Sequence, residues 1–264
     1  MFKVERKLQV KSVIIDIALW LKEYADTNKI KSLVVGVSGG IDSALVSTLC
    51  VMSGIKTYCI VLPLHQKPEQ TERGEKHIEW LMKKSYNMEM IKVDLSETFD
   101  TFKYAIPSNT LNELALVNTR SRLRMTTLYQ IAQAKGGIVV GTGNKVEDLG
   151  IGFFTKYGDG GVDIAPIADL YKSEVYAMAK ELNVIEEIQT ARPTDGLWDN
   201  DRDDETQIGA TYDELEWVME YLDTTPHDLV TLNLTDRERE VLKIYLSFNK
   251  RNKHKMVDIP IFKI

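Results

Sequence analysis

The sequence predicts an α/β fold, a single-domain three-layer sandwich in which helices cover a mostly parallel, doubly wound sheet. Three observations lead to this prediction. Short apolar runs recur along the chain, amphipathic stretches with helical spacing lie between them, and a glycine-rich turn joins the first run to an apolar helix start. Strands that alternate with helices in this way form a parallel sheet that is covered on both sides.

Apolar residues at helical spacing over 13–24 predict an amphipathic first helix, and the apolar run 33–37 predicts the first strand. Further strands are expected at 56–62, 88–93 and 137–141, with helices at 69–84 and around 111–134. Residues 157–161 are glycine-rich and predict a turn.

The acidic stretch 194–209 has little apolar periodicity, and its composition favours a solvated linker. Because it directly follows Arg192-Pro193-Thr194, it also suggests a lid that orders over bound nucleotide.

Composition and charge narrow the class of function. With 264 residues, 44% of them hydrophobic, the chain can bury one core, and a single domain over 1–264 is expected. Its net charge of -6 disfavours nucleic acid and anionic lipid as partners. No apolar segment approaches the roughly 20 residues that cross a bilayer, and the first ten residues lack the apolar core of a signal peptide. We therefore expect no membrane partner and a cytoplasmic location.

The turn between the first strand and the next helix reads Ser38-Gly39-Gly40-Ile41-Asp42-Ser43. Its glycines let the backbone approach a ligand, and the helix behind it presents unpaired N–H groups, which suits a phosphate chain. A carboxylate beside phosphates needs a cation between them, so Asp42 suggests Mg²⁺. The turn is not a Walker A motif, because residues 33–55 contain no lysine.

An ordinary capped strand-to-helix turn is the alternative, but the full string directly after a Val-rich strand favours phosphate binding. Ligands of parallel sheets bind beyond the carboxyl ends of the strands, so the turn and the loop after Gly141 should share one crevice. Asp42 and Glu147 would then face each other and hold Mg²⁺. For Glu147 alone, the alternative is an acid in the first turn of a helix.

The turn and several downstream segments resemble the ammonia-dependent NAD synthetases, which belong to the N-type ATP pyrophosphatases. The matching segments are Gly141-Thr142-Gly143-Asn144-Lys145-Val146-Glu147, residues 152–163, Asp169-Leu170-Tyr171-Lys172, Arg192-Pro193-Thr194-Asp195 and His254-Lys255. The match extends from about residue 33 almost to the last residue. One departure is the spacing from Glu147 to Gly152, which is one residue longer than in the commoner family pattern.

The resemblance implies a ligase that amidates deamido-NAD with ammonia, using ATP as co-substrate and Mg²⁺ as cofactor. The nicotinate carboxylate would attack the α-phosphate of ATP, pyrophosphate would leave, and ammonia would displace AMP from the NAD-adenylate. The family also implies a homodimer.

The resemblance implies roles for particular residues as well. ATP contacts are Gly36, Val37, Ser38, Gly39, Gly40, Ile41, Asp42, Ser43, Thr142, Lys172 and Thr194. Deamido-NAD contacts are Arg122, Lys156, Asp163, His254 and Lys255, while Asp42 and Glu147 are the metal ligands. Lys172 and Asp159 would be catalytic, Asp159 by handling the ammonium proton. Arg120 and Arg124 lie beside Arg122, and the sequence leaves open which of the three contacts substrate.

Several of these residues also have a structural interpretation. Lys172 could be an exposed residue at a helix start, Asp159 could fix the conformation of its turn, and His254-Lys255 could belong to a solvated basic tail. Alternative functions are amidation or thiolation of a purine nucleotide or tRNA base, and a nonenzymatic nucleotide-binding regulator. The acidic chain lacks the basic face expected of a tRNA-modifying enzyme.

Overall fold

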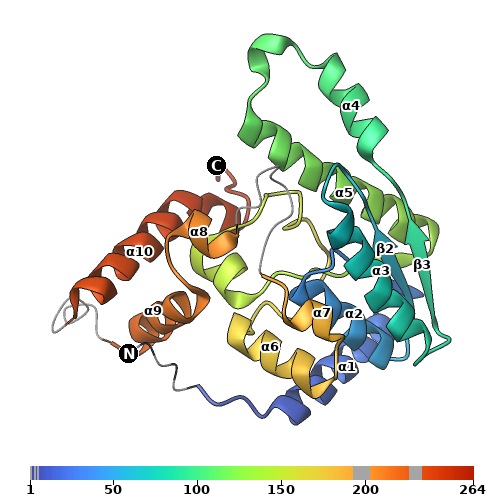
Figure 1. Cartoon of the computed structure of the whole chain (residues 1–264), viewed down its shortest axis with the longest axis horizontal. Helices are drawn as coiled ribbons and strands as arrows, with labels where there is room; N and C mark the ends of the chain where they lie inside the picture. Colours follow the sequence, from blue (N-terminus) through green and yellow to red (C-terminus); the bar gives the residue numbers. More distant parts are fainter. Residues whose placement is uncertain (1, 3, 5, 193–202, 226–233) are drawn as a thin grey trace.

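A computed structural model describes the chain except for residues 1, 3, 5, 193–202 and 226–233. The described strands are β1 (Ser32–Gly36), β2 (Lys56–Val61), β3 (Met88–Lys92) and β4 (Gly137–Val139). They form one parallel sheet in the order β3-β2-β1-β4, part of which is visible in Figure 1. The predicted α/β class and parallel sheet are confirmed.

Helices cover both faces of the sheet because β1 is apolar on both sides. Leu33 and Val35 point to one face and Val34 to the other, and all three are fully buried. The first face is covered by α1 (Val10–Thr27), α2 (Ile41–Met52), α3 (Pro68–Met82), α6 (Lys172–Glu181) and α7 (Glu186–Gln189). The opposite face packs on α4 (Ser96–Ala105) and α5 (Glu113–Ala134), between which the short 3₁₀ turn η1 (Ser108–Thr110) lies.

A further group of helices lies beside the sheet and has its own apolar cluster. It comprises the π-helix η2 (Val146–Ile151), α8 (Asp204–Ile208), α9 (Tyr212–Thr224) and α10 (Asp236–Met256), and Figure 1 shows α8, α9 and α10 together at one side of the molecule. Thr211 and Thr235 begin α9 and α10 with capping boxes, in which Glu214 and Glu238 return the hydrogen bonds. In the described part of the chain, no helix is long and apolar enough to cross a membrane.

Most predicted elements are confirmed to within a few residues, namely the first helix, the four strands, α3, α5 and the turn at 157–161. The prediction of a loop over 194–209 is wrong for its last part, because Asp204–Ile208 forms α8. Asp203 caps this helix by accepting a hydrogen bond from the Thr206 amide at 2.7 Å. The earlier part, which includes Thr194, lies outside the described residues.

The segment between Glu147 and Gly152, whose spacing departs from the commoner family pattern, lies in the π-helix η2. Single π-helical turns occur mostly within α-helices and often at functional sites. Gly152 then ends η2 in the left-handed region, with φ of 63°. A Cβ at Gly152 would lie 2.6 Å from the Cβ of Asn252, so α10 packs directly against this backbone.

The strand order places the switch point of the sheet between β1 and β4, since the chain adds β2 on one side of β1 and β4 on the other. Ligands of open parallel sheets bind at the carboxyl ends of the strands that flank this point. The loops after Gly36 and Val139 therefore define the expected site.

A buried histidine links α3 to α2 behind the first of these loops. The Nε2 atom of His77 lies 2.9 Å from Ser47 Oγ, and burial lowers the pKa of His77 to about 4. Because the unfolded chain binds this proton near pH 6.5 and the folded chain does not, stability should fall by about 3 kcal/mol as pH drops from 6.5 to 4. We expect urea unfolding of His77→Gln to show a flatter pH dependence in this range. An unchanged slope would contradict the assignment.

Candidate active site

The turn between β1 and α2 is held in shape by its own residues. Gly39 has φ of 85°, and a Cβ there would lie 2.4 Å from the Gln70 carbonyl oxygen, so only glycine fits. Ser43 Oγ accepts a hydrogen bond from the Ser38 amide at 3.2 Å and donates to the Gly40 carbonyl oxygen at 3.0 Å. The turn is thus preorganised with its backbone amides at the start of α2, an arrangement that suits an anion.

A cavity of about 810 Å³ opens at the switch point and brings together segments that are far apart in the sequence. Its walls come from the turn after β1, the end of β4 with residues 140–143, η2, the start of α6 and the end of α10. A cavity of this size at this place in the fold suits a nucleotide-sized ligand.

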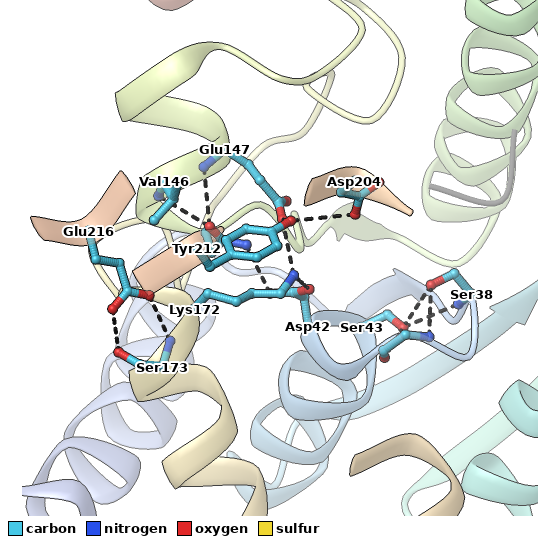
Figure 2. A network of polar contacts seen from close by, with 12 residues as sticks. Ser38, Asp42, Ser43, Val146, Glu147, Lys172, Ser173, Asp204, Tyr212 and Glu216 are labelled. Carbon is cyan, nitrogen blue, oxygen red and sulfur yellow. Dashed lines mark hydrogen bonds and ion pairs between the residues drawn. The ribbon is translucent and has the colours of Figure 1, made fainter. Parts of the chain in front are cut away.

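Three charged side chains meet at the floor of this cavity. The Lys172 ammonium lies 2.6 Å from Asp42 Oδ2 and 3.0 Å from Glu147 Oε1, as Figure 2 shows. Lys172 begins α6 and is only 4% exposed, which excludes the interpretation of an exposed residue at a helix start. Asp42 and Glu147 share one cavity, as expected, and the cation that joins them in this structure is Lys172.

Polar groups from the helices beside the sheet complete this network. Tyr212 on α9 donates a hydrogen bond to Glu147 Oε1 at 2.6 Å, and its hydroxyl lies 3.4 Å from Asp204 Oδ2 on α8 (Figure 2). Asn144 Nδ2 donates to Asp42 Oδ1 at 3.1 Å. None of these three residues was predicted as a site residue from the sequence, although Asn144 lies inside a matching segment.

The pKa values reflect burial and these partners. Burial alone would lower the pKa of Lys172, but the two carboxylates raise it well above its usual range. Burial raises the pKa of Asp42 despite the ammonium. Burial also raises the pKa of Glu147, but the Lys172 ammonium and the hydrogen bond from the Tyr212 hydroxyl lower it by more. The pKa of Glu147 therefore lies below its usual value.

Asp148 is a further acid of the cavity, and the sequence alone did not single it out. Burial, together with Glu147 and other nearby acids, raises its pKa to about 8. The Asp148 carboxylate packs against the backbone of Gly143. A Cβ at residue 143 would lie 2.0 Å from Asp148 Oδ2, so a larger residue there would displace the carboxylate.

The structure brings most of the predicted site residues to the cavity wall. Those that line it are Gly36, Val37, Ser38, Gly40, Ile41, Asp42, Ser43, Thr142, Glu147, Asp159, Lys172, His254 and Lys255. Gly39, Arg122, Lys156 and Asp163 are not among the residues that line it, and Thr194 lies outside the described residues. Of the three neighbouring arginines, Arg124 lines the cavity, whereas Arg122 does not.

The predicted substrate contacts outside the cavity have other partners in this structure. Asp163 accepts hydrogen bonds from the Val139 amide at 2.7 Å and from the Tyr129 hydroxyl at 3.1 Å, which fixes the end of β4. Lys156 donates to the His254 carbonyl oxygen at 2.9 Å, so the turn at 157–161 and the end of α10 are joined beside the cavity.

Asp159 combines a cavity position with a structural role. Its Oδ1 accepts hydrogen bonds from Ser121 Oγ at 2.6 Å and from the Thr155 amide at 3.0 Å, and burial raises its pKa. For the ammonia-dependent reaction that the resemblance implies, we expect Asp159→Asn to lower the rate roughly 100-fold or more and to alter its pH profile. If steady-state rates from pH 6 to 9 are unchanged, Asp159 only holds the turn.

The two acids of the network fit a magnesium ion that is bound together with a nucleotide. Mg²⁺ in such sites takes one or two carboxylates and completes its octahedron with phosphate oxygens and waters. Asp42 and Glu147 supply two carboxylates in one cavity next to the turn. Within the described ranges, no group of three or more His, Cys, Asp or Glu side chains could hold a metal by itself. The ion would therefore depend on the phosphates of the ligand.

Comparisons with known proteins identify relatives that match almost the whole chain. A family model described as NAD synthase matches residues 13–258. The NH(3)-dependent NAD(+) synthetase of Finegoldia magna is 35% identical over 241 residues, which cover 90% of this chain and 96% of that protein. Among solved structures, the NMN synthetase of Francisella tularensis is similar with a TM-score of 0.84 and 28% identity, covering 98% of this chain and 100% of that one. An NH3-dependent NAD synthetase from Campylobacter jejuni, in complex with the nitrate ion, has a TM-score of 0.78 and 26% identity, covering 97% and 100%.

Proposed function

The chain belongs to the NAD synthase family, and from this premise we infer that it is an ammonia-dependent ligase that converts deamido-NAD to NAD with ATP. The observation that carries this inference is the meeting of Asp42, Glu147 and Lys172 in one cavity at the sheet's switch point, beside a glycine turn suited to phosphate.

The reaction takes place in two steps. A carboxylate oxygen of the nicotinate attacks the α-phosphorus of ATP, and the bond to pyrophosphate breaks with its electrons leaving on pyrophosphate. Ammonia then attacks the acyl carbon, AMP departs with the oxygen that came from the carboxylate, and one proton is released. The carboxylate needs this activation because its own oxygen is a poor leaving group, whereas AMP leaves readily.

The residues of the cavity have distinct proposed tasks in these steps. The turn Ser38–Ser43 orients the triphosphate through backbone amides, and Lys172 stabilises negative charge at the α-phosphate. Asp42 and Glu147 would hold Mg²⁺, which would supply positive charge beside the pyrophosphate.

Deamido-NAD is proposed to bind near the end of α10 and the turn at 157–161. Lys255 supports this placement, because it lines the cavity and donates to the Phe154 carbonyl oxygen at 2.6 Å. Arg122, Lys156, Asp163 and His254 remain proposed contacts of the same substrate, and Thr194 remains a proposed contact of ATP. A homodimer and a cytoplasmic location also remain predictions.

A product assay with purified protein tests the function. With ATP, Mg²⁺ and ammonium present, we expect AMP, pyrophosphate and NAD in equal amounts when deamido-NAD is added and none when it is omitted. Xanthosine monophosphate replaces deamido-NAD in a second arm, and turnover there would favour amidation of a purine nucleotide. ATP binding without turnover in either arm would favour the nonenzymatic regulator.

A second candidate substrate is the acid mononucleotide that would yield NMN. It is favoured by the Francisella tularensis NMN synthetase, which matches almost the whole chain with a TM-score of 0.84. Nicotinic acid mononucleotide is therefore included as a third arm. A higher kcat/KM for the mononucleotide than for deamido-NAD would identify it as the preferred substrate.

A further inference from the structure

The phosphate turn lacks a lysine of its own, and the lysine that contacts its Asp42, Lys172, also pairs with Glu147. Lys172 forms ion pairs with both Asp42 and Glu147, so two carboxylates offset its single charge. A triphosphate chain brings several negative charges into this space. Further positive charge close to the turn would stabilise the phosphates that lie farthest from Lys172.

Helix α3 places an arginine at the turn. A Cβ at Gly39 would lie 3.1 Å from the Gly74 amide nitrogen, and a Cβ at Gly74 would lie 3.2 Å from the Val37 carbonyl oxygen. This close approach of two glycines brings the preceding residue, Arg73, to the wall of the cavity. Arg73 Nε donates a hydrogen bond to the Gly39 carbonyl oxygen at 2.7 Å.

The charge of Arg73 has no counter-ion among the residues that the structure describes. Its hydrogen bond to Gly39 uses one of the five N–H donors of the guanidinium. Partial burial lowers the pKa of Arg73, because the charge loses contact with water and gains no carboxylate in return. A charged, half-buried guanidinium that lines a cavity is suited to an anionic ligand.

We propose that Arg73 binds the β- and γ-phosphates of ATP and the pyrophosphate that leaves. This proposal rests on the proposed function for the identity of the nucleotide. The guanidinium is planar and can donate two parallel hydrogen bonds to phosphate oxygens, while the bond to Gly39 fixes its orientation. When the bond between the α-phosphorus and pyrophosphate breaks, its electrons remain on pyrophosphate, and Arg73 stabilises that charge.

Titration calorimetry with magnesium pyrophosphate, at several salt concentrations, tests this contact without turnover. We expect Arg73→Gln to weaken pyrophosphate binding roughly 10- to 100-fold, to reduce the dependence of affinity on salt, and to leave AMP binding within about twofold. Arg73→Lys, which keeps the charge without the planar fork, should recover part of the affinity and the salt dependence. Lys76→Gln is the matched control, because it removes an exposed positive charge from the same helix.

Two results would overturn the proposal. If Arg73→Gln binds pyrophosphate as tightly as the natural chain, the guanidinium does not contact phosphate. If pyrophosphate and AMP affinity fall together with an unchanged salt dependence, Arg73 acts only by holding Gly39. Failure of the proposed amidation would appear separately, as an absence of product while pyrophosphate binding still depends on Arg73.

Discussion

Replacing Lys172 with methionine is expected to lower kcat/KM for NAD formation by roughly 1,000-fold or more. Loss of one preorganised charge aimed at the reacting phosphoryl group costs about 100- to 1,000-fold, and methionine also leaves Asp42 and Glu147 without the ammonium that they share. Breaking a buried ion pair in this way typically destabilises a protein by about 3–5 kcal/mol. Steady-state kinetics and urea unfolding measure the two effects.

Lys172→Arg serves as the comparison, because it keeps the charge with a different shape. We expect it to retain more stability than the methionine variant and to remain below one tenth of the natural activity, since a bulky guanidinium cannot fit the same buried space without displacement. A methionine variant with near-natural kcat would show that Lys172 is only a structural ion-pair partner.

Replacing Glu147 with glutamine is expected to raise the magnesium concentration for half-maximal activity at least about tenfold and to lower the rate at saturating Mg²⁺ about 100-fold. A carboxamide keeps the size of the side chain and can still accept from Tyr212, but it is a weak magnesium ligand. Activity titrated with Mg²⁺ at fixed ATP, together with Mg²⁺-dependent ATP binding by calorimetry, measures the change.

Glu181→Gln at the exposed end of α6 is the control for this substitution, because it removes a carboxylate outside the cavity. It should leave both the magnesium dependence and the rate unchanged. An identical magnesium dependence in Glu147→Gln and the natural chain would remove Glu147 from the metal site.

The sequence predicted the parts of the site that depend on local pattern. A Val-rich strand followed by Ser38–Ser43 predicts a glycine turn at the start of a helix, and the parallel order of the strands brings Glu147 to the same edge of the sheet as Asp42. The position of Lys172 between these acids depends on how α6 packs against α2, which no local pattern encodes.

Other residues were missed because their sequence context is ordinary. Tyr212 begins an amphipathic helix like many core tyrosines, and only the packing of α9 beside η2 directs its hydroxyl at Glu147. Arg73 lies in a charged helical stretch that is typical of a solvated face. The close approach of Gly39 and Gly74, which brings Arg73 to the turn, can be seen only in the three-dimensional structure.

The oxygen atoms of the substrate carboxylate report directly whether that carboxylate attacks ATP. Deamido-NAD labelled with ¹⁸O in the nicotinate carboxyl group is incubated with ATP, Mg²⁺ and ammonium, and AMP and pyrophosphate are analysed by mass spectrometry. Attack on the α-phosphorus predicts one ¹⁸O in each AMP formed and none in pyrophosphate. Unlabelled AMP, or label in pyrophosphate or inorganic phosphate, would contradict adenylation of the carboxylate in this cavity.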